Sequence, residues 1–70
     1  MATYDVTALV YMDGQYHELT EQRTSMNKAE RLARSWAKNP LKIERIVEGT
    51  AITTYVPAHS VSLVDIEEVI

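Results

Sequence analysis

The sequence predicts an α+β fold, a two-layer domain in which one antiparallel sheet, in the order ββαβββ, carries one helix packed on one face. Three observations predict it. Apolar and polar residues alternate over stretches near both ends of the chain, a central stretch repeats apolar residues at helical spacing, and Asp13-Gly14 separates two alternating runs. The 70 residues contain no linker and no repeat, so residues 1–70 are expected to form a single domain.

The first two strands are expected to form a tight hairpin. Apolar residues occupy the even positions from Tyr4 to Met12, which is the period of a strand with one buried face. Asp13-Gly14 supplies the two positive-φ positions of a type I′ turn, and a second strand is expected over residues 15–20. The turn sets the register, which pairs Met12 with Gln15, Tyr11 with Tyr16, Leu9 with Glu18 and Ala8 with Leu19.

An amphipathic helix is expected next. Its N-terminus has two candidate caps: Asn27, which precedes Glu30 at the spacing of a capping box, and the competing Ser25. Asn39-Pro40 ends the helix, because the residue before proline avoids the α region. One apolar stripe recurs at i, i+3, i+4, i+7 and i+8; it consists of Ala29, Leu32, Ala33, Trp36 and Ala37. Within it, Trp36 and Leu32 are expected to anchor the core.

Three more strands are expected after the helix. Alternation from Leu41 to Val47 predicts the third strand, and Gly49-Thr50 suits a type II′ turn into the fourth. Pro57 ends the fourth strand because it has no N–H to donate, and the fifth is expected over residues 61–66. The predicted register pairs Val47 with Ile52, Ile46 with Thr53, Glu44 with Tyr55 and Ile43 with Val56.

The two faces of this sheet have different expected roles. The helix would bury one face, formed by Val6, Ala8, Val10, Ile43, Val47, Ile52 and Val56. The other face would stay uncovered and would gather Leu9, Tyr11, Tyr16, Ile46 and Tyr55 beside Glu18 and Glu44. Tyrosine offers a large contact area at low entropic cost, so these five residues are the candidate interface for a protein partner or a second copy. The alternative is that the tyrosines are scattered exposed aromatics, which are normal on soluble proteins.

Charge is segregated along the chain. All seven Lys and Arg residues fall between positions 23 and 45, a segment of net charge +5, although the whole chain carries −3. The candidate nucleic-acid contacts are the basic residues in and before the helix: Arg23, Lys28, Arg31, Arg34 and Lys38. They suit phosphate binding, whereas the acidic overall balance is unusual for a nucleic-acid-binding domain. A solvated helix face is the ordinary alternative, and an acidic partner is another.

Length and composition favour self-association. A chain of 70 residues with no Phe, one Trp and no Cys has a small core and neither disulfides nor thiolate-held zinc to reinforce it. Such domains often complete their core by forming oligomers, so a homodimer is expected. No stretch is long enough to span a membrane, and the N-terminus lacks the features of a signal peptide. A cytoplasmic location is therefore expected, in the host cytosol if a phage encodes the protein.

The sequence offers no constellation typical of catalysis. His59 lies in a Pro-Ala-His-Ser corner beside Ser60 and Ser62, but neighbours on a strand point to opposite faces and do not assemble a triad. His17 and His59 without a third spaced ligand make a weak metal site. Gly14 and Gly49 are explained by turns rather than by phosphate binding. We therefore expect no enzyme activity, no metal and no cofactor, and a structural role for His59.

Two resemblances accompany these patterns. The run TTYVPAHSVSLVDI, residues 53–66, resembles the end of an Sm-like domain, although an Sm domain begins with its helix. In size and character the chain is similar to short prophage-encoded accessory proteins, a group that includes anti-CRISPR proteins. That resemblance implies an inhibitor or adaptor that binds a host defence complex, often as a dimer. The sequence thus predicts a small binding module that occupies a host macromolecular partner, with nucleic-acid binding by the basic helix 23–38 as the alternative.

Overall fold

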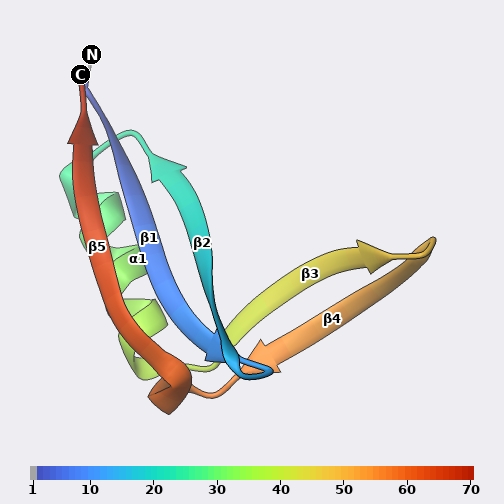
Figure 1. Ribbon diagram of the computed structural model, residues 1–70. Helices are drawn as coiled ribbons and strands as arrows, with labels where there is room; N and C mark the ends of the chain where they lie inside the picture. Colours follow the sequence, from blue (N-terminus) through green and yellow to red (C-terminus); the bar gives the residue numbers. More distant parts are fainter. Residues whose placement is uncertain (1) are drawn as a thin grey trace.

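The computed structural model describes residues 2–70 and confirms an α+β fold with the strand order ββαβββ. The elements are β1 (Thr3–Met12), β2 (Gln15–Arg23), α1 (Met26–Lys38), β3 (Leu41–Val47), β4 (Thr50–Val56), the short 3₁₀ turn η1 (Ala58–Ser60) and β5 (Val61–Val69). Two parts are distinct in Figure 1: a body, formed by β1, β2, α1 and β5, and an arm, the β3–β4 hairpin that projects from one end of it.

β1 is the central strand of the body. It pairs antiparallel with β2 on one side and with β5 on the other, which gives the order β2-β1-β5. The predicted hairpin register is confirmed from Met12–Gln15 to Ala8–Leu19, and Asp13 and Gly14 both have positive φ. β2 and β5 continue beyond the predicted ends to Arg23 and Val69, because both follow β1 to its first residues. The ladder to β5 contains an irregularity between Leu9 and Val10.

α1 lies on one face of this three-stranded sheet (Figure 1). The cap is Ser25, whose Oγ accepts a hydrogen bond from the Lys28 N–H at 3.3 Å, so the competing cap prevails over Asn27. The helix ends before Pro40, as predicted. The buried core consists of Val6, Ala8, Val10, Ala29, Trp36, Leu41 and Val56, and Leu32 packs against it. Trp36 is 6% exposed, in agreement with its predicted role.

The prediction of one five-stranded sheet is wrong. β3 and β4 form a separate two-stranded sheet, and of their four residues expected beneath the helix only Val56 is buried, while Val47 is 45% exposed. The reason is one of size. A helix is about 10 Å across and strands are about 4.8 Å apart, so a single helix with a narrow, alanine-rich stripe has too little surface to cover five strands.

The arm closes with a different turn from the predicted one. Glu48 and Gly49, with φ of 50° and 78°, form the turn, and both values are those of a type I′ geometry. Val47 therefore pairs with Thr50 and Ile43 with Thr54. The register differs by two residues from the prediction, and because strands alternate with period two, the assignment of side chains to the two faces of the hairpin is unchanged.

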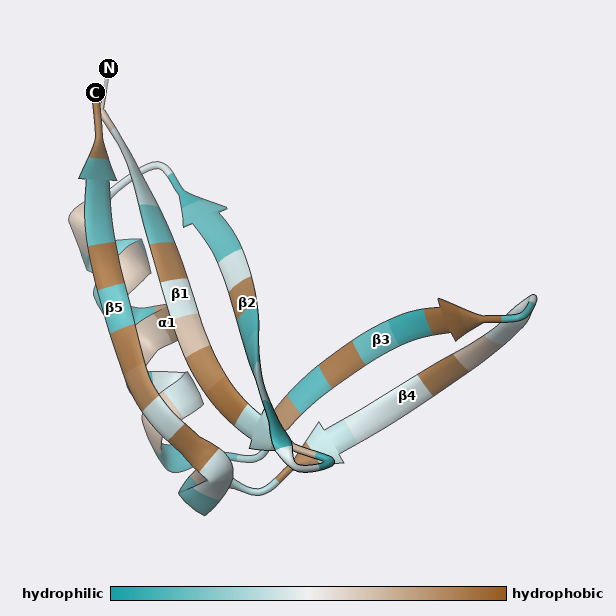
Figure 2. Cartoon of the chain, in the orientation of Figure 1, coloured by the Kyte–Doolittle hydropathy of each residue, from teal (hydrophilic) through white to brown (hydrophobic). Residues whose placement is uncertain are grey.

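Hydrophobic residues continue along the arm to its tip, as the brown bands of Figure 2 show. Only the base of the arm joins the core, through Leu41 and Val56, each 3% exposed. A two-stranded hairpin alone is marginally stable in water, so the outer arm depends on more than its own hydrogen bonds. Within residues 2–70, no helix has the length and apolar character needed to cross a membrane.

Candidate functional site

The most exposed large apolar side chains of the arm lie on one face of the hairpin. Ile46 is 78% exposed and Tyr55 is 65% exposed, and the β3–β4 register places both on the face that also carries Lys42, Glu44 and Ala51. Lys42 Nζ lies 3.1 Å from Glu44 Oε1 on the same strand. That hydrogen bond and the charge of Glu44 raise the pKa of Lys42. The face therefore presents two apolar side chains beside a self-neutralised ion pair.

A tyrosine pair lies at the end of the body from which the arm projects. The rings of Tyr11 and Tyr16 meet edge to face, with centroids 5.1 Å apart and planes at 65°. Both side chains are at least half exposed. Tyr11 and Tyr55 line the same hollow of about 240 Å³, so the body and the arm each contribute one aromatic wall. Met12, Asp13, Arg45, Thr54, Val56, Pro57 and Ser60 complete its lining.

The five residues predicted as one interface are therefore divided between two sheets. Leu9, Tyr11 and Tyr16 lie on the face of the body sheet opposite α1, whereas Ile46 and Tyr55 lie on the arm. The structure brings Tyr11 and Tyr55 to one hollow, and that hollow does not include Ile46. They were expected on one continuous face because all five strands were expected to form one sheet, whereas β3 and β4 form a separate sheet.

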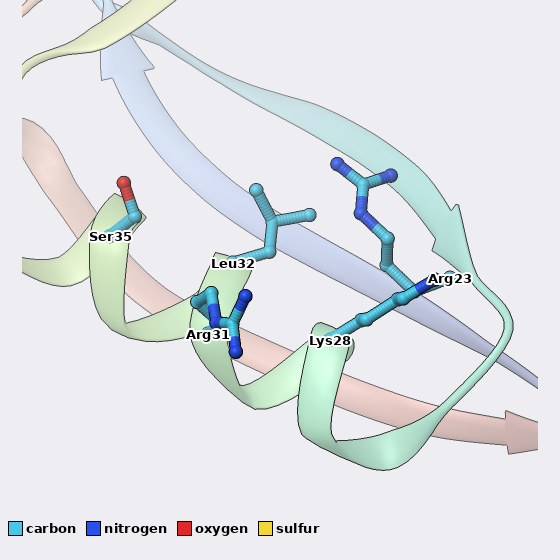
Figure 3. Close-up of a pocket in the computed structure, with 5 residues that line it drawn as sticks. All are labelled: Arg23, Lys28, Arg31, Leu32 and Ser35. Atoms are coloured by element: carbon cyan, nitrogen blue, oxygen red, sulfur yellow. The ribbon is translucent and has the colours of Figure 1, made fainter.

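A second surface, the basic hollow, lies between α1 and the end of β2 (Figure 3). It has a volume of about 340 Å³ and is lined by Arg23, Lys28, Arg31, Leu32 and Ser35, with no carboxylate among them. Arg23 is held in place: its guanidinium donates to the Gln22 carbonyl oxygen at 2.9 Å and to Glu21 Oε1 at 3.5 Å. Glu21 also partly neutralises it, so Lys28 and Arg31 supply most of the free positive charge.

The structure separates the remaining predicted nucleic-acid contacts from this hollow. Arg34 lines a different hollow, between α1 and β5, and its guanidinium lies 3.8 Å from Glu30. Lys38 is in the last turn of α1, where a cation suits the negative end of the helix dipole. Three of the five predicted residues, Arg23, Lys28 and Arg31, thus form one group.

The body face opposite α1 is acidic. The ladders place Asp5 and Glu18 on this face together with Asp65 and Glu67 of β5, and no Lys or Arg shares it. Asp5 accepts a hydrogen bond from the Gln22 side-chain amide at 3.1 Å. Leu63 of β5, 46% exposed, lies opposite Leu9. Sequence reasoning missed Leu63 and the acidic row because the pairing of β5 with β1 was not foreseen.

The two histidines lie on different elements, β2 and η1. His59 is exposed in η1, where the turn is closed by a hydrogen bond of 2.9 Å from the Ser60 N–H to the Pro57 carbonyl. His17 is on β2, at a hollow that also involves Glu18 and Ile43. Among residues 2–70, no three His, Asp or Glu side chains are grouped so as to hold a metal ion.

Arg45 is a surface residue whose position the sequence did not indicate. It lines the tyrosine hollow with Tyr11 and Tyr55 and also a smaller hollow of about 180 Å³ beside His17 and Glu18. Alternation alone placed Arg45 on a strand, but nothing in the pattern showed that the arm would leave the body and open these two spaces.

No protein-family description, curated protein or solved structure matches this chain.

Proposed function

We propose that this protein is a small non-enzymatic binding module that acts in the cytosol by occupying a protein partner through its arm. The observation that carries the proposal is the exposure of Ile46 and Tyr55 on a hairpin that projects from the body. Tyrosine and bulky aliphatic side chains are typical anchors of protein interfaces. When a projecting hairpin binds a partner, its exposed apolar face becomes buried against that partner.

The nearby tyrosine hollow supports a protein rather than a small ligand. The arm face, the Tyr11–Tyr16 pair and the hollow between Tyr11 and Tyr55 lie at the same end of the molecule. Although they belong to two sheets, they offer a partner aromatic and aliphatic groups with polar neighbours, which is the character of an interface core and its rim. The partner is proposed to be a host defence complex; this part of the proposal rests on the size and character of the chain, which are similar to those of prophage-encoded accessory proteins.

The test is capture of partners from a host lysate by the wild type and by Tyr55→Ala. Truncation of an interface anchor costs about 2 kcal/mol or more, so Tyr55→Ala should lose most of the captured protein while its circular dichroism stays native. Met26→Ala is the matched control, since Met26 is an exposed apolar side chain on α1. The contradicting result would be that, after nuclease treatment, Tyr55→Ala captures as much protein as the wild type does. The arm would then not be the contact element.

A second candidate function, nucleic-acid binding, is favoured by the basic hollow alone. Lys28 and Arg31 contribute two of its three cations, which suit the phosphates of a single strand or of a duplex backbone. The double variant Lys28→Ala/Arg31→Ala should abolish a salt-dependent affinity for DNA or RNA, measured by fluorescence anisotropy. Arg34→Ala/Lys38→Ala removes the same charge from outside the hollow and should weaken binding less. No binding by the wild type at low salt would eliminate this candidate.

A further inference from the structure

Four strand edges of the structure have no neighbouring strand: those of β2 and β5 in the body and those of β3 and β4 in the arm. Three of them carry charged side chains. β2 has Glu18, Glu21 and Arg23; β3 has Lys42, Glu44 and Arg45; β5 has Asp65, Glu67 and Glu68. β4, with the sequence TAITTYV, has none.

This difference bears on association because free edges pair readily with other strands. Proteins usually protect an edge with charges, proline, a bulge or a cover. β4 contains no charge, no Pro and no Gly, and it is rich in β-branched residues of high strand propensity. It also lies on the side of the arm away from β2 (Figure 1). Of the four free edges in residues 2–70, that of β4 is thus the least protected against pairing with another strand.

The hairpin geometry shows which backbone groups β4 offers. In a hairpin closed by a two-residue turn, the pair that flanks the turn is hydrogen-bonded, and hydrogen-bonded and non-hydrogen-bonded pairs then alternate. Val47 and Thr50 flank the turn, so Thr50, Ile52 and Thr54 are expected to direct their backbone groups toward β3. The intervening residues, Ala51, Thr53 and Tyr55, are expected to direct their N–H and C=O groups to the free edge.

We propose that the free edge of β4 pairs antiparallel with β4 of a second copy, about a two-fold axis at Thr53. The register places Thr53 opposite Thr53 of the other copy, Ala51 opposite Tyr55, Ile52 opposite Thr54 and Thr50 opposite Val56. All seven residues of the strand can take part, and the two arms become one four-stranded sheet.

The pattern of β4 fits a copy of itself. At each of two symmetric positions, the small side chain of Ala51 in one copy lies opposite the large side chain of Tyr55 in the other. The residues whose backbone groups point to the free edge also lie opposite one another, as the hydrogen bonds of an antiparallel ladder require. Charge makes two other edges poor choices. A two-fold at the centre of β3 would place Glu44 against Glu44, and one at the centre of β5 would place Asp65 against Asp65, which is destabilising. On β4 no charge is brought into the ladder.

The dimer also explains how the arm can be ordered. A two-stranded hairpin is marginal alone, whereas three or more strands with an apolar face can be stable. Pairing would also bring Ile46 and Tyr55 of both copies onto one sheet face, doubling the surface of the proposed partner site. One strand pair buries less than the roughly 800 Å² per partner of a typical stable complex, so the association is expected to be weak and visible at high concentration.

Two measurements test the pairing, and neither needs the partner protein. Sedimentation of the wild type over a wide concentration range should show a reversible monomer–dimer equilibrium, which Thr53→Lys weakens at least tenfold by placing two ammonium groups at the axis. Thr20→Lys, on the charged edge of β2, is the control and should leave the equilibrium unchanged. Circular dichroism of both variants establishes that they are folded.

Cysteine cross-linking tests the register directly, because the chain contains no cysteine of its own. A residue on the two-fold axis meets its own copy at about 5.5 Å between Cα atoms, a distance that a disulfide spans. Mild oxidation should therefore convert Thr53→Cys to a covalent dimer at concentrations where Thr20→Cys, also at an exposed position, stays monomeric. A wild type that is monomeric at all concentrations, or a dimer in which Thr53→Cys cross-links no faster than Thr20→Cys, would overturn the proposal.

Discussion

At the scale of single residues, the body depends on a few well-buried side chains. Trp36 lies on the only helix of the described chain and is 6% exposed. Removing a buried Trp side chain typically costs about 3–5 kcal/mol, while the whole domain has a stability of about 5 kcal/mol. We therefore expect Trp36→Ala to be largely unfolded in urea-free buffer, as measured by circular dichroism. A cooperative transition at the wild-type midpoint would show that α1 packs by another face.

A second residue-scale prediction concerns Tyr4, which links β1, the first strand of the body, to β5, the last. Its hydroxyl donates to Glu68 Oε2 at 3.2 Å. Desolvation, with smaller contributions from the hydrogen bond and charge of Glu68, raises the pKa of Tyr4 above its ordinary value of 10.0. A group whose pKa is raised by folding stabilises the fold below its unfolded pKa, and this contribution is lost as the pH rises through the folded pKa.

The comparison of Tyr4→Phe with the wild type isolates that contribution. Urea midpoints should fall more steeply for the wild type than for Tyr4→Phe as the pH rises above about 10. Ionisation of lysines affects both proteins in the same way and cancels in the difference. Identical pH profiles for the two proteins would indicate that the Tyr4–Glu68 hydrogen bond does not persist in solution.

At the scale of elements, the arm and the body should separate in their contributions to stability. The seven buried hydrophobic residues all lie outside residues 44–53. A variant that replaces this segment with Asn-Gly keeps the Ile43–Thr54 pair and closes it with a favourable type I′ turn. We expect its thermal midpoint to stay within several degrees of the wild type, as scanning calorimetry would measure, and partner capture to be lost.

The outcome that would contradict this separation is a global loss of the cooperative transition. It would mean that the outer arm contributes to the core of the monomer. Retained capture by the shortened protein would instead place the contact surface on the body, at the Tyr11–Tyr16 pair or the acidic face, or at the remaining Tyr55. Because the variant removes Ile46 and leaves Tyr55, adding Tyr55→Ala to it would separate the body from the remaining tyrosine of the arm.

At the scale of the whole molecule, local sequence patterns predicted the individual elements, but they did not predict how the two hairpins are arranged relative to each other. Asp13-Gly14, the helix stripe and Pro40 each act within a few residues, so the first hairpin register and the end of α1 were predictable. The path of the arm depends on how many strands one helix can cover, which no local pattern states. The turn was misplaced because Glu48, with its positive φ, is not a residue typical of that conformation.

The candidate site shows the same limit. The exposed tyrosines and the basic stretch were identifiable by residue type, and Arg23, Lys28 and Arg31 do line one hollow. The division of the tyrosine set between body and arm, the place of Arg45 and the acidic row formed with β5 all follow from pairings between distant segments. Alternation assigns a side chain to a face, but it does not say which sheet that face belongs to.

The central claim is that the arm is the binding element of the molecule and that it is stabilised by contact with another chain. Amide hydrogen exchange of the purified protein, followed from dilute to concentrated solution, tests it most directly. We predict fast exchange in the arm and slow exchange in β1 at low concentration, with protection at Ala51, Thr53 and Tyr55 rising as concentration increases and none gained along β2. Arm amides as protected as those of β1 in the dilute monomer, or unchanged by concentration, would contradict the account.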